Sequence, residues 1–245
     1  MPAKAKTKTR TKRVAPSGAP SRQLAEYESK RDFRKTKEPS GKGRSKGKAK
    51  RRHPRFAFQK HSATSEHYDL RLEVDGVLAS WAVPKGPSLD PRDKRLAMRT
   101  EDHPLEYLEW EGVIPEGQYG AGPMIVWDRG VFQNISETRR GEPMELAEAI
   151  EKGDVKLFML GEKIKGAYAL VRTGPPSNRE KWLLIKKRDE GADARRRPTS
   201  SQPESVLSGR TIEQVLDEEA EPGQFKRHRA RRPPRPAVVN RLARR

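Results

Sequence analysis

Apolar and polar side chains alternate along short segments between residues 55 and 187, and Gly, Pro and Asp residues separate these segments. Alternation with a period of two is typical of β-strands that bury one face. The segments are RFAFQ, HYDLRLEV, VLASWAV, RLAMRT, PMIVWD, DVKLFML, AYALVRT and KWLLIKK. The pattern therefore predicts a mainly β protein, a compact barrel or sandwich of about eight strands.

Turn and cap residues predict how some of these elements begin and end. The VDGV sequence at residues 74–77 indicates a two-residue hairpin, because Asp-Gly readily adopts positive φ angles. Few helices are expected, all of them short. One covers about residues 22–31, and another covers Pro143–Lys152, with the proline in its first turn and Gly153 at its end. Thr211 is expected to cap a third.

Charge divides the chain into a nearly neutral middle and two basic ends. Residues 1–52 hold 19 Lys and Arg against four acids, and residues 221–245 hold nine against one. Apolar residues make up 32% of the chain, which is low for a wholly folded protein. We expect a disordered basic arm (1–20), an N-terminal segment with a basic linker (21–52), a β-barrel core (53–190), and a polar linker with a short helix and a basic disordered tail (191–245).

Basic ends of this kind favour a nucleic-acid partner, because they displace counterions from a polyphosphate. A membrane surface or an acidic protein is the competing interpretation. The first 20 residues resemble a transit peptide in charge but lack its apolar face, so a solvated arm is the better interpretation. No apolar stretch is long enough to span a bilayer, and the chain has no cysteine. We therefore expect a cytoplasmic, nucleoid-associated protein without disulfides.

The segment HSATSEHYDLR, which begins at His61, contains the clearest candidates for functional residues. A strand there places His67, Asp69 and Arg71 on one face and the residues between them on the other. Any one of these residues alone is consistent with an ordinary half-exposed strand. Together they are less ordinary, since two of the chain's five histidines flank a carboxylate within eleven residues.

Two imidazoles and one carboxylate form a common ligand set for a divalent ion, and His61 reaches the same point if the loop before the strand curls back. Manganese, zinc and iron all remain open. Arg71 places a permanent forked cation beside that point, which suits a phosphate. Further along, DHPLEY holds His103, a candidate proton donor or phosphate ligand. The simpler interpretation of DHPLEY is a surface loop. The glycine-rich IPEGQYGAG segment carries no predicted catalytic role.

Taken together, Gln59, HSATSEHYDLR, WAVPKG, DHPLEY, IPEGQYGAG and WLLIKK resemble the 3′-phosphoesterase family, the end-healing domain found in ligase D and as free-standing proteins. The resemblance covers about residues 25–190, with the motifs in family order. It implies a small β-barrel with a polar interior cavity that holds the site. No polymerase or ligase motif accompanies it, which suggests a free-standing member with unusually basic tails.

The resemblance also implies roles for individual residues. A manganese site is implied for His61, His67 and Asp69, although other divalent ions are possible. A site for the scissile phosphate is implied for Arg71, His103 and Tyr107. Further positions near the pocket are Gln59, Lys85 and Arg95. An N-terminal segment that acts on terminal ribonucleosides matches KRDFRKTKEPSG, with Arg31, Asp32 and Glu38.

The implied reaction is metal-dependent and has two steps on a DNA 3′ end. A phosphodiesterase step removes the last ribonucleoside and leaves a 3′-phosphate, and a phosphomonoesterase step then yields a 3′-hydroxyl. The implied substrates are primer-templates ending in a 3′-ribonucleotide or a 3′-phosphate, and the implied partners are a DNA ligase or polymerase, or Ku, in non-homologous end joining. Two alternatives remain: a non-catalytic nucleic-acid-binding barrel with basic arms, and a cupin-like iron oxygenase.

Overall fold

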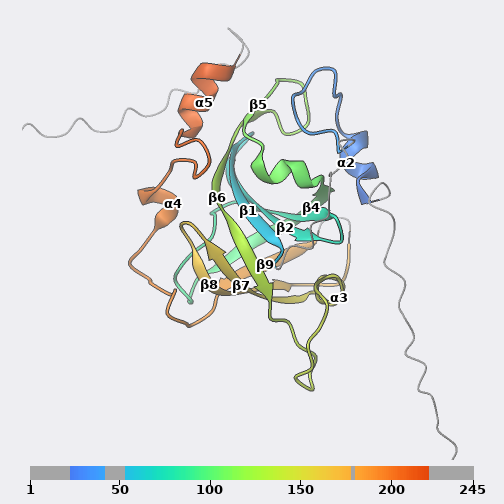
Figure 1. The fold of residues 1–245 in the computed structure, drawn as a ribbon, viewed down its shortest axis with the longest axis vertical. Coiled ribbons are helices and arrows are strands. Elements are labelled where there is room, and N and C mark those ends of the chain that lie inside the picture. Colours follow the sequence, from blue (N-terminus) through green and yellow to red (C-terminus); the bar gives the residue numbers. More distant parts are fainter. Residues whose placement is uncertain (1–22, 42–52, 178–179, 221–245) are drawn as a thin grey trace, which may run out of the picture.

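One antiparallel sheet closes on itself in the computed structural model, which describes residues 23–41, 53–177 and 180–220. The strands follow the order β1-β2-β3-β4-β9-β8-β7-β6, and β1 also pairs with β6 (Figure 1). The strands are β1 (Arg55–Ser62), β2 (Glu66–Val74), β3 (Val77–Val83), β4 (Lys94–His103), β5 (Gly112–Ile114), β6 (Gly122–Asn134), β7 (Asp154–Gly161), β8 (Lys165–Arg172) and β9 (Lys181–Lys186). The expected barrel of about eight strands is confirmed, and β5 adds a short strand beside β6.

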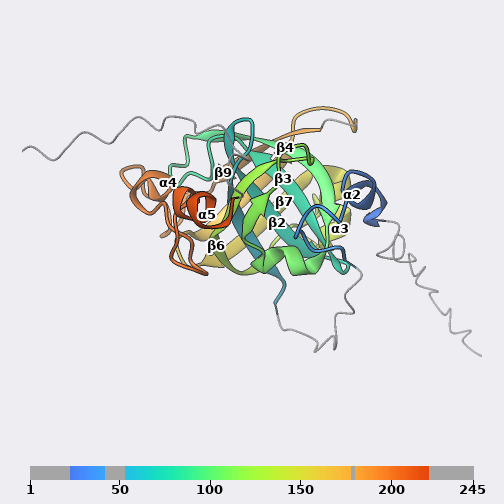
Figure 2. The ribbon, with the colours of Figure 1, turned by 90° about the horizontal axis from the view of Figure 1, so that it is seen from above.

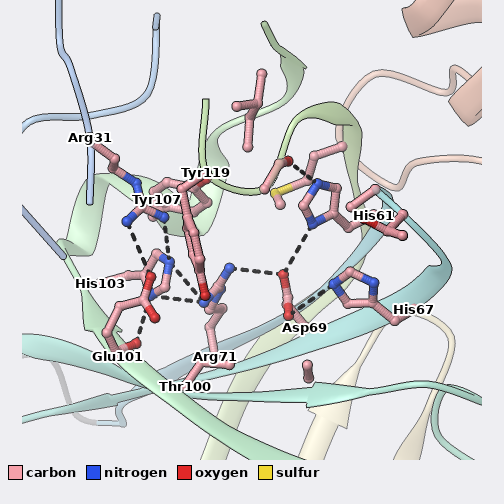
Figure 3. Close-up of a pocket in the computed structure, with 16 residues that line it drawn as sticks. Arg31, His61, His67, Asp69, Arg71, Thr100, Glu101, His103, Tyr107 and Tyr119 are labelled. Atoms are coloured by element: carbon pink, nitrogen blue, oxygen red, sulfur yellow. Dashed lines mark hydrogen bonds and ion pairs between the residues drawn. The ribbon is translucent and has the colours of Figure 1, made fainter. Parts of the chain in front are cut away.

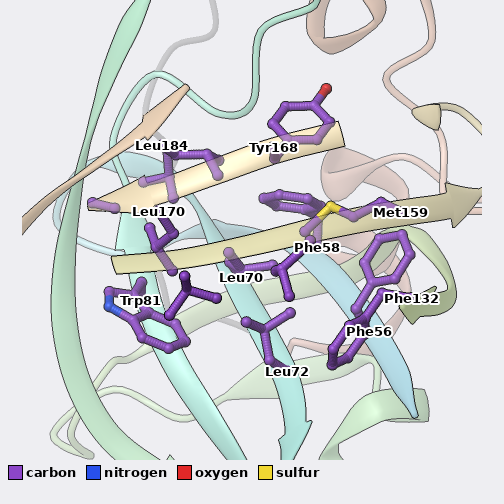
Figure 4. Close-up of a cluster of buried hydrophobic side chains, with 14 of the residues drawn as sticks. Phe56, Phe58, Leu70, Leu72, Trp81, Phe132, Met159, Tyr168, Leu170 and Leu184 are labelled. Atoms are coloured by element: carbon purple, nitrogen blue, oxygen red, sulfur yellow. The ribbon is translucent and has the colours of Figure 1, made fainter. Parts of the chain in front are cut away.

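Apolar side chains fill the inside of the barrel (Figure 4). All eight barrel strands contribute to one buried cluster, which includes Phe58 on β1, Leu70 on β2, Trp81 on β3, Leu170 on β8 and Leu184 on β9. Burying these large side chains is the main favourable term in closing the sheet. The barrel interior is therefore a packed core of the ordinary kind.

The polar interior cavity expected from the resemblance is thus wrong. Residues of β2 alternate as predicted, and Tyr68, Leu70 and Leu72 belong to the interior cluster. His67, Asp69 and Arg71 must then face outward, because successive side chains of a strand point to opposite faces. Burial in the closed interior is more favourable for the apolar side chains of β2 than for the polar ones, so the polar side chains lie on the outer surface.

Short helices and loops cover that outer surface. The helices are α2 (Ala25–Ser29), the 3₁₀ turn η1 (Leu105–Glu109), α3 (Leu146–Lys152), α4 (Pro198–Ser201) and α5 (Ile212–Glu219). Tyr27 of α2 and Tyr107 of η1 join a second apolar cluster that lies on outward-facing residues of β1, β3 and β6. On another side, α5 lies beside β6 (Figure 2). Its Ile212 and Val215 pack against Val113 and Ile125. Segments at both ends of the described chain thus pack against the outside of the barrel.

The local signals are confirmed with one exception. Asp75 and Gly76 have φ angles of 48° and 86° in the β2–β3 turn, and Gly153 ends α3 with a φ of 82°. Thr211 caps α5 through a capping box with Gln214. The helix predicted from Pro143 instead begins at Leu146, because Pro143 pairs with Glu137 in an isolated β-bridge.

The predicted basic arm and tail (1–20 and 221–245) and most of the basic linker lie outside the described residues. Residues 191–220, predicted as a polar linker and short helix, contain α4 and α5. Within the described part of the chain, no helix has the length and apolar character needed to cross a membrane.

Candidate metal and phosphate site

A cavity of about 300 Å³ lies on the outer face of the barrel (Figure 3). Outward-facing side chains of β1, β2, β3 and β4 form its floor. Arg31, which follows α2, and Tyr119, from the loop between β5 and β6, contribute further walls. The cavity therefore joins chain segments as distant in sequence as Arg31 and Met124, and the sheet register holds its floor in place.

His61, His67 and Asp69 meet at one end of this cavity. The strand register pairs His61 of β1 directly with His67 of β2, and Asp69 is the next outward residue. One possible ligand atom from each of the three side chains lies within 4.8 Å of the others. Asp69 Oδ2 is 3.7 Å from His61 Nδ1, and Asp69 Oδ1 is 3.6 Å from His67 Nε2. The predicted ligand trio is thus brought together without the loop having to curl back.

The remaining ring nitrogen of each histidine is anchored to a backbone carbonyl. His61 Nε2 lies 2.8 Å from the Gly120 carbonyl, and His67 Nδ1 lies 2.9 Å from the Ser65 carbonyl. Because a carbonyl oxygen only accepts, these nitrogens carry the protons and donate. The lone pairs of His61 Nδ1 and His67 Nε2 then face the carboxylate. This is the arrangement that metal-ligating histidines commonly adopt, so the three residues fit a divalent ion.

Arg71 connects the ligand trio to the rest of the cavity. Its Nη2 donates to Asp69 Oδ2 at 3.0 Å, and its Nε donates to Gln59 Oε1 at 3.1 Å. Burial alone would raise the pKa of Asp69, but the positive charge of the neighbouring Arg71 opposes this effect, so that the pKa of Asp69 lies well below its usual value. Asp69 is therefore ionised throughout the physiological range, as a metal ligand must be.

His103 lies beside Arg71, on the side away from the ligand trio. Its Nδ1 donates to the Glu101 carbonyl at 2.8 Å, and Arg71 Nη1 and Arg31 Nη2 lie 3.2 Å and 3.3 Å from its Nε2. Burial, followed by the two guanidinium groups, lowers the pKa of His103 well below its usual value. The ring is thus neutral in the absence of an anion. A phosphate between these groups would offset both effects and favour the protonated ring.

The N-terminal segment reaches the cavity through Arg31. Arg31 donates to Glu38 Oε1 at 2.8 Å and to Glu101 Oε1 at 3.1 Å, and its guanidinium stacks 3.8 Å from the centre of the Tyr27 ring. Glu38 also accepts from the Tyr107 hydroxyl at 2.7 Å. All of these side chains are buried or nearly so. The segment before the basic linker is therefore packed into the site, which is what its predicted role requires.

The predicted site residues differ in how close they come to the cavity. The residues that line it are Arg31, His61, His67, Asp69, Arg71, His103 and Tyr107. Gln59 and Glu38 stand behind them and hold Arg71, Arg31 and Tyr107 in position. Asp32, Lys85 and Arg95 do not line the cavity. Asp32 pairs with Arg34, and Arg95 pairs with Asp93, while Lys85 is exposed after β3.

Several cavity residues were not predicted from the sequence, and three of them, Glu101, Tyr119 and Gly120, contact predicted site residues. Glu101 forms ion pairs with both Lys30 and Arg31. It precedes the predicted His103 by two residues, but no sequence pattern set it apart. Tyr119 and Gly120 belong to the glycine-rich segment that carried no predicted role. A Gln-Tyr-Gly sequence between strands was the only signal, and it is too common to identify a site. Gly120 acts through its carbonyl, which no side-chain pattern reveals.

Comparison with known proteins points to one family. The model of the DNA Ligase D 3′-phosphoesterase domain matches residues 59–172. The multifunctional non-homologous end joining protein LigD of Pseudomonas aeruginosa is 47% identical over 194 residues, which cover 78% of this chain and 22% of that protein. The LigD proteins of Mycolicibacterium smegmatis and Mycobacterium tuberculosis are 42% and 41% identical over 68% and 65% of the chain. The matched regions make up 21% and 19% of these two relatives, so the chain corresponds to a small part of each.

Proposed function

Because the barrel belongs to the DNA ligase D 3′-phosphoesterase domain family, we propose that this protein is a metal-dependent phosphoesterase that repairs DNA 3′ ends in non-homologous end joining. Its substrates are primer-templates that end in a 3′-ribonucleotide or a 3′-phosphate. Its products are 3′-hydroxyl ends, which a polymerase can extend or a ligase can seal. A DNA ligase or polymerase, or Ku, is the partner that such a role implies.

The observation that carries the proposal is the juxtaposition of a metal-ligand trio with two buried guanidinium groups. His61, His67 and Asp69 would hold the ion, and manganese suits their mixture of imidazole and carboxylate donors. A bound divalent ion would polarise a phosphoryl oxygen and lower the pKa of water at the site. Arg71 touches both Asp69 and His103, so it spans the distance between the metal end and the phosphate end of the cavity.

The chain's own groups then bind and neutralise the phosphate. Arg71 Nη1 and Arg31 Nη2 both lie near His103 Nε2, so a phosphate oxygen at this point would receive hydrogen bonds from two guanidinium groups. Such an anion would favour the protonated form of His103, which could then give its Nε2 proton to the leaving oxygen. The Tyr107 ring packs against His103, with centroids 4.8 Å apart, and fixes the ring's orientation.

Removal of a terminal ribonucleoside requires contacts beyond the phosphate. The N-terminal segment is suited to provide them, because Arg31 joins the phosphate end of the cavity to Glu38. Asp32 follows Arg31 directly and is partly exposed. We propose that Arg31, Asp32 and Glu38 serve this first step, with Lys85, Arg95 and Gln59 supporting substrate binding.

The proposal is tested by following the products made from a 5′-labelled primer-template that ends in one ribonucleotide. We expect a 3′-phosphate product first and a 3′-hydroxyl product later, both dependent on manganese and both abolished by a chelator. DNA binding without hydrolysis in any of several divalent metals would instead indicate a non-catalytic binding module. Oxygen consumption with a small organic substrate, without 3′ products, would indicate an iron oxygenase.

Replacing Asp32 by Ala should slow ribonucleoside removal much more than phosphate removal. Asp32 lies outside the cavity that holds the phosphate, so the second step does not need it. We expect a decrease of about tenfold or more in the first step, the cost of one lost polar contact of roughly 1.4 kcal/mol or more. Separate assays with a ribonucleotide-ended primer and a 3′-phosphate primer measure the two steps. Equal losses in both would contradict this division of labour.

A further inference from the structure

An exposed basic surface lies at one end of the barrel. It is formed by the connection between β3 and β4 and by the segment that follows β9. We refer to it as the basic ridge. Its exposed cations are Lys85, Arg92, Lys94, Lys187, Arg188, Arg195, Arg196 and Arg197. The whole segment after β9 lies beyond residues 59–172, the part that matches the family model.

Backbone contacts hold the two parts of the basic ridge together, and the Asp189 carboxylate fixes the turn that follows β9. The backbone N–H of Asp193 donates to the Leu89 carbonyl at 2.9 Å. Asp189 pairs with the buried Lys186 and accepts from the backbone N–H of Gly191 at 2.9 Å. Strand pairing places Lys94, at the start of β4, beside the end of β9. The cations therefore stand on a defined surface of the barrel.

The basic ridge has more positive charge than its own carboxylates neutralise. Residues 84–95 and 186–197 hold ten Lys and Arg against five acids, although residues 53–220 as a whole carry more acids than bases. Asp90, Asp93 and Asp193 each pair with a nearby arginine. Six cations have no ion pair within 4 Å among the residues that the structure describes: Lys85, Lys94, Lys187, Arg188, Arg196 and Arg197. Concentrated and uncompensated charge of this kind attracts a polyanion.

The outer face of β4 leads from the cavity to the basic ridge. Thr100 lines the cavity, and Lys94 lies six residues earlier on the same face of the strand. Six residues of a strand span roughly 20 Å. Leu96, between them, is 42% exposed, so this part of the path is open. Roughly 20 Å corresponds to about six base pairs of duplex DNA.

We propose that the basic ridge binds the phosphodiester backbone of the duplex about six base pairs behind the 3′ end that enters the cavity. The assignment rests on the proposed function, because that function places the DNA end in the cavity. Lysine and arginine contacts to phosphates are independent of base sequence, which suits an enzyme that must accept any broken end. The basic ridge would orient the duplex so that its terminal phosphate faces Arg71.

The test is an equilibrium binding measurement that requires no hydrolysis. Fluorescence anisotropy of a labelled DNA hairpin with a 3′-phosphate is recorded with the full chain in the presence of a chelator. The basic-ridge variant is Arg196→Ser/Arg197→Ser. Its matched control is Arg139→Ser/Arg140→Ser, which removes two exposed arginines between β6 and α3 and changes the net charge equally. Lys187→Ser/Arg188→Ser is a second basic-ridge variant.

For a stem of about twelve base pairs, we expect both basic-ridge variants to bind roughly tenfold more weakly, with a salt dependence shallower by about two units. The control should lose at most about twofold. For a stem of about four base pairs, which is too short to reach the basic ridge, all variants should bind as the wild type does.

Equal losses in the basic-ridge and control variants would show that only net charge matters, and would overturn the proposal. Wild-type affinity in the basic-ridge variants would also overturn it and would leave an acidic protein as the partner to test. Because binding is measured without hydrolysis, failure of the proposed phosphoesterase activity would not change these outcomes. A protein with basic-ridge-dependent binding but no hydrolysis would count against the proposed activity alone.

Discussion

Replacing His67 by Ala should abolish both hydrolytic steps. His67 supplies one of the three candidate ligand atoms, and its other ring nitrogen is already committed to the Ser65 carbonyl. Losing it leaves one imidazole and one carboxylate, which are too few to hold a divalent ion firmly in a catalytic position. We expect turnover to fall by at least about a thousandfold on both a ribonucleotide-ended and a 3′-phosphate primer, since the metal supplies several kcal/mol of charge stabilisation.

A histidine outside the cavity provides the control for this variant. His53 is exposed at the start of the barrel and does not line the cavity. His53→Ala should retain wild-type rates in both assays. Measuring both variants at several manganese concentrations distinguishes weaker metal binding from a folding defect, since excess metal rescues only the former. A His67→Ala protein that hydrolyses either primer at the wild-type rate would remove the metal trio from the mechanism.

Arg71→Lys should also cause a large loss, although the positive charge remains. Arg71 uses separate nitrogens to contact Asp69, Gln59 and His103, and it is almost fully buried. An ammonium group cannot reproduce this fork, so at least one contact is lost and the charge is displaced from the phosphate. We expect kcat to fall by about 10² to 10³, the usual cost of one transition-state donor. Both steps should be affected, because both act on a phosphate in the same cavity.

Arg55→Lys is the matched control, because Arg55 pairs with Glu73 at the end of the same two strands, away from the cavity. It should leave kcat unchanged. Inhibition by inorganic phosphate tests whether Arg71 contacts the phosphate directly. If Arg71 only supported the structure, its replacement would leave the inhibition constant for phosphate unchanged. Arg71→Lys should raise the inhibition constant for phosphate while manganese binding persists. Normal phosphate inhibition in an inactive Arg71→Lys protein would contradict direct contact with the phosphate.

The floor of the site was predictable because a strand has a simple period. Alternation along β2 correctly placed His67, Asp69 and Arg71 on one face, and pairing with β1 then brought His61 opposite His67. The Asp-Gly turn between β2 and β3 was equally predictable, since few residue pairs adopt two positive φ angles. These features depend on residues that are near neighbours in sequence.

Which face of the strand closes on the inside was not predictable from alternation alone. The answer depends on apolar residues of all eight strands, such as Trp81 on β3 and Leu170 on β8, which must meet in a single interior. Because these apolar side chains fill the interior, the polar face of β2 lies on the outside. The places of Tyr119 and Glu101 in the cavity were also unpredictable, because they depend on tertiary contacts that no sequence period encodes.

The resemblance supplied site residues that the pattern did not. Glu38 is an example, since an acid in a basic segment gives no sign that it will accept hydrogen bonds from both Arg31 and Tyr107. Lys85 and Arg95 are different, because they do not line the cavity. Lys85 belongs to the basic ridge, because it lies in the connection between β3 and β4, whereas Arg95 is the second residue of β4 and pairs with Asp93. Contact with the bound duplex would reconcile the predicted substrate role of Lys85 with this location.

A titration with manganese tests the central claim most directly, because it asks whether the trio on the outer face of the barrel holds a metal at all. Electron paramagnetic resonance of free Mn²⁺ is recorded for the full-length wild type, for His67→Ala and for His53→Ala. We expect the wild type and His53→Ala to bind one ion per chain with the same affinity. His67→Ala should bind at least about tenfold more weakly, because even the loss of a partner that orients a metal ligand usually costs about 10- to 100-fold in affinity. Equal binding by all three proteins would contradict the account.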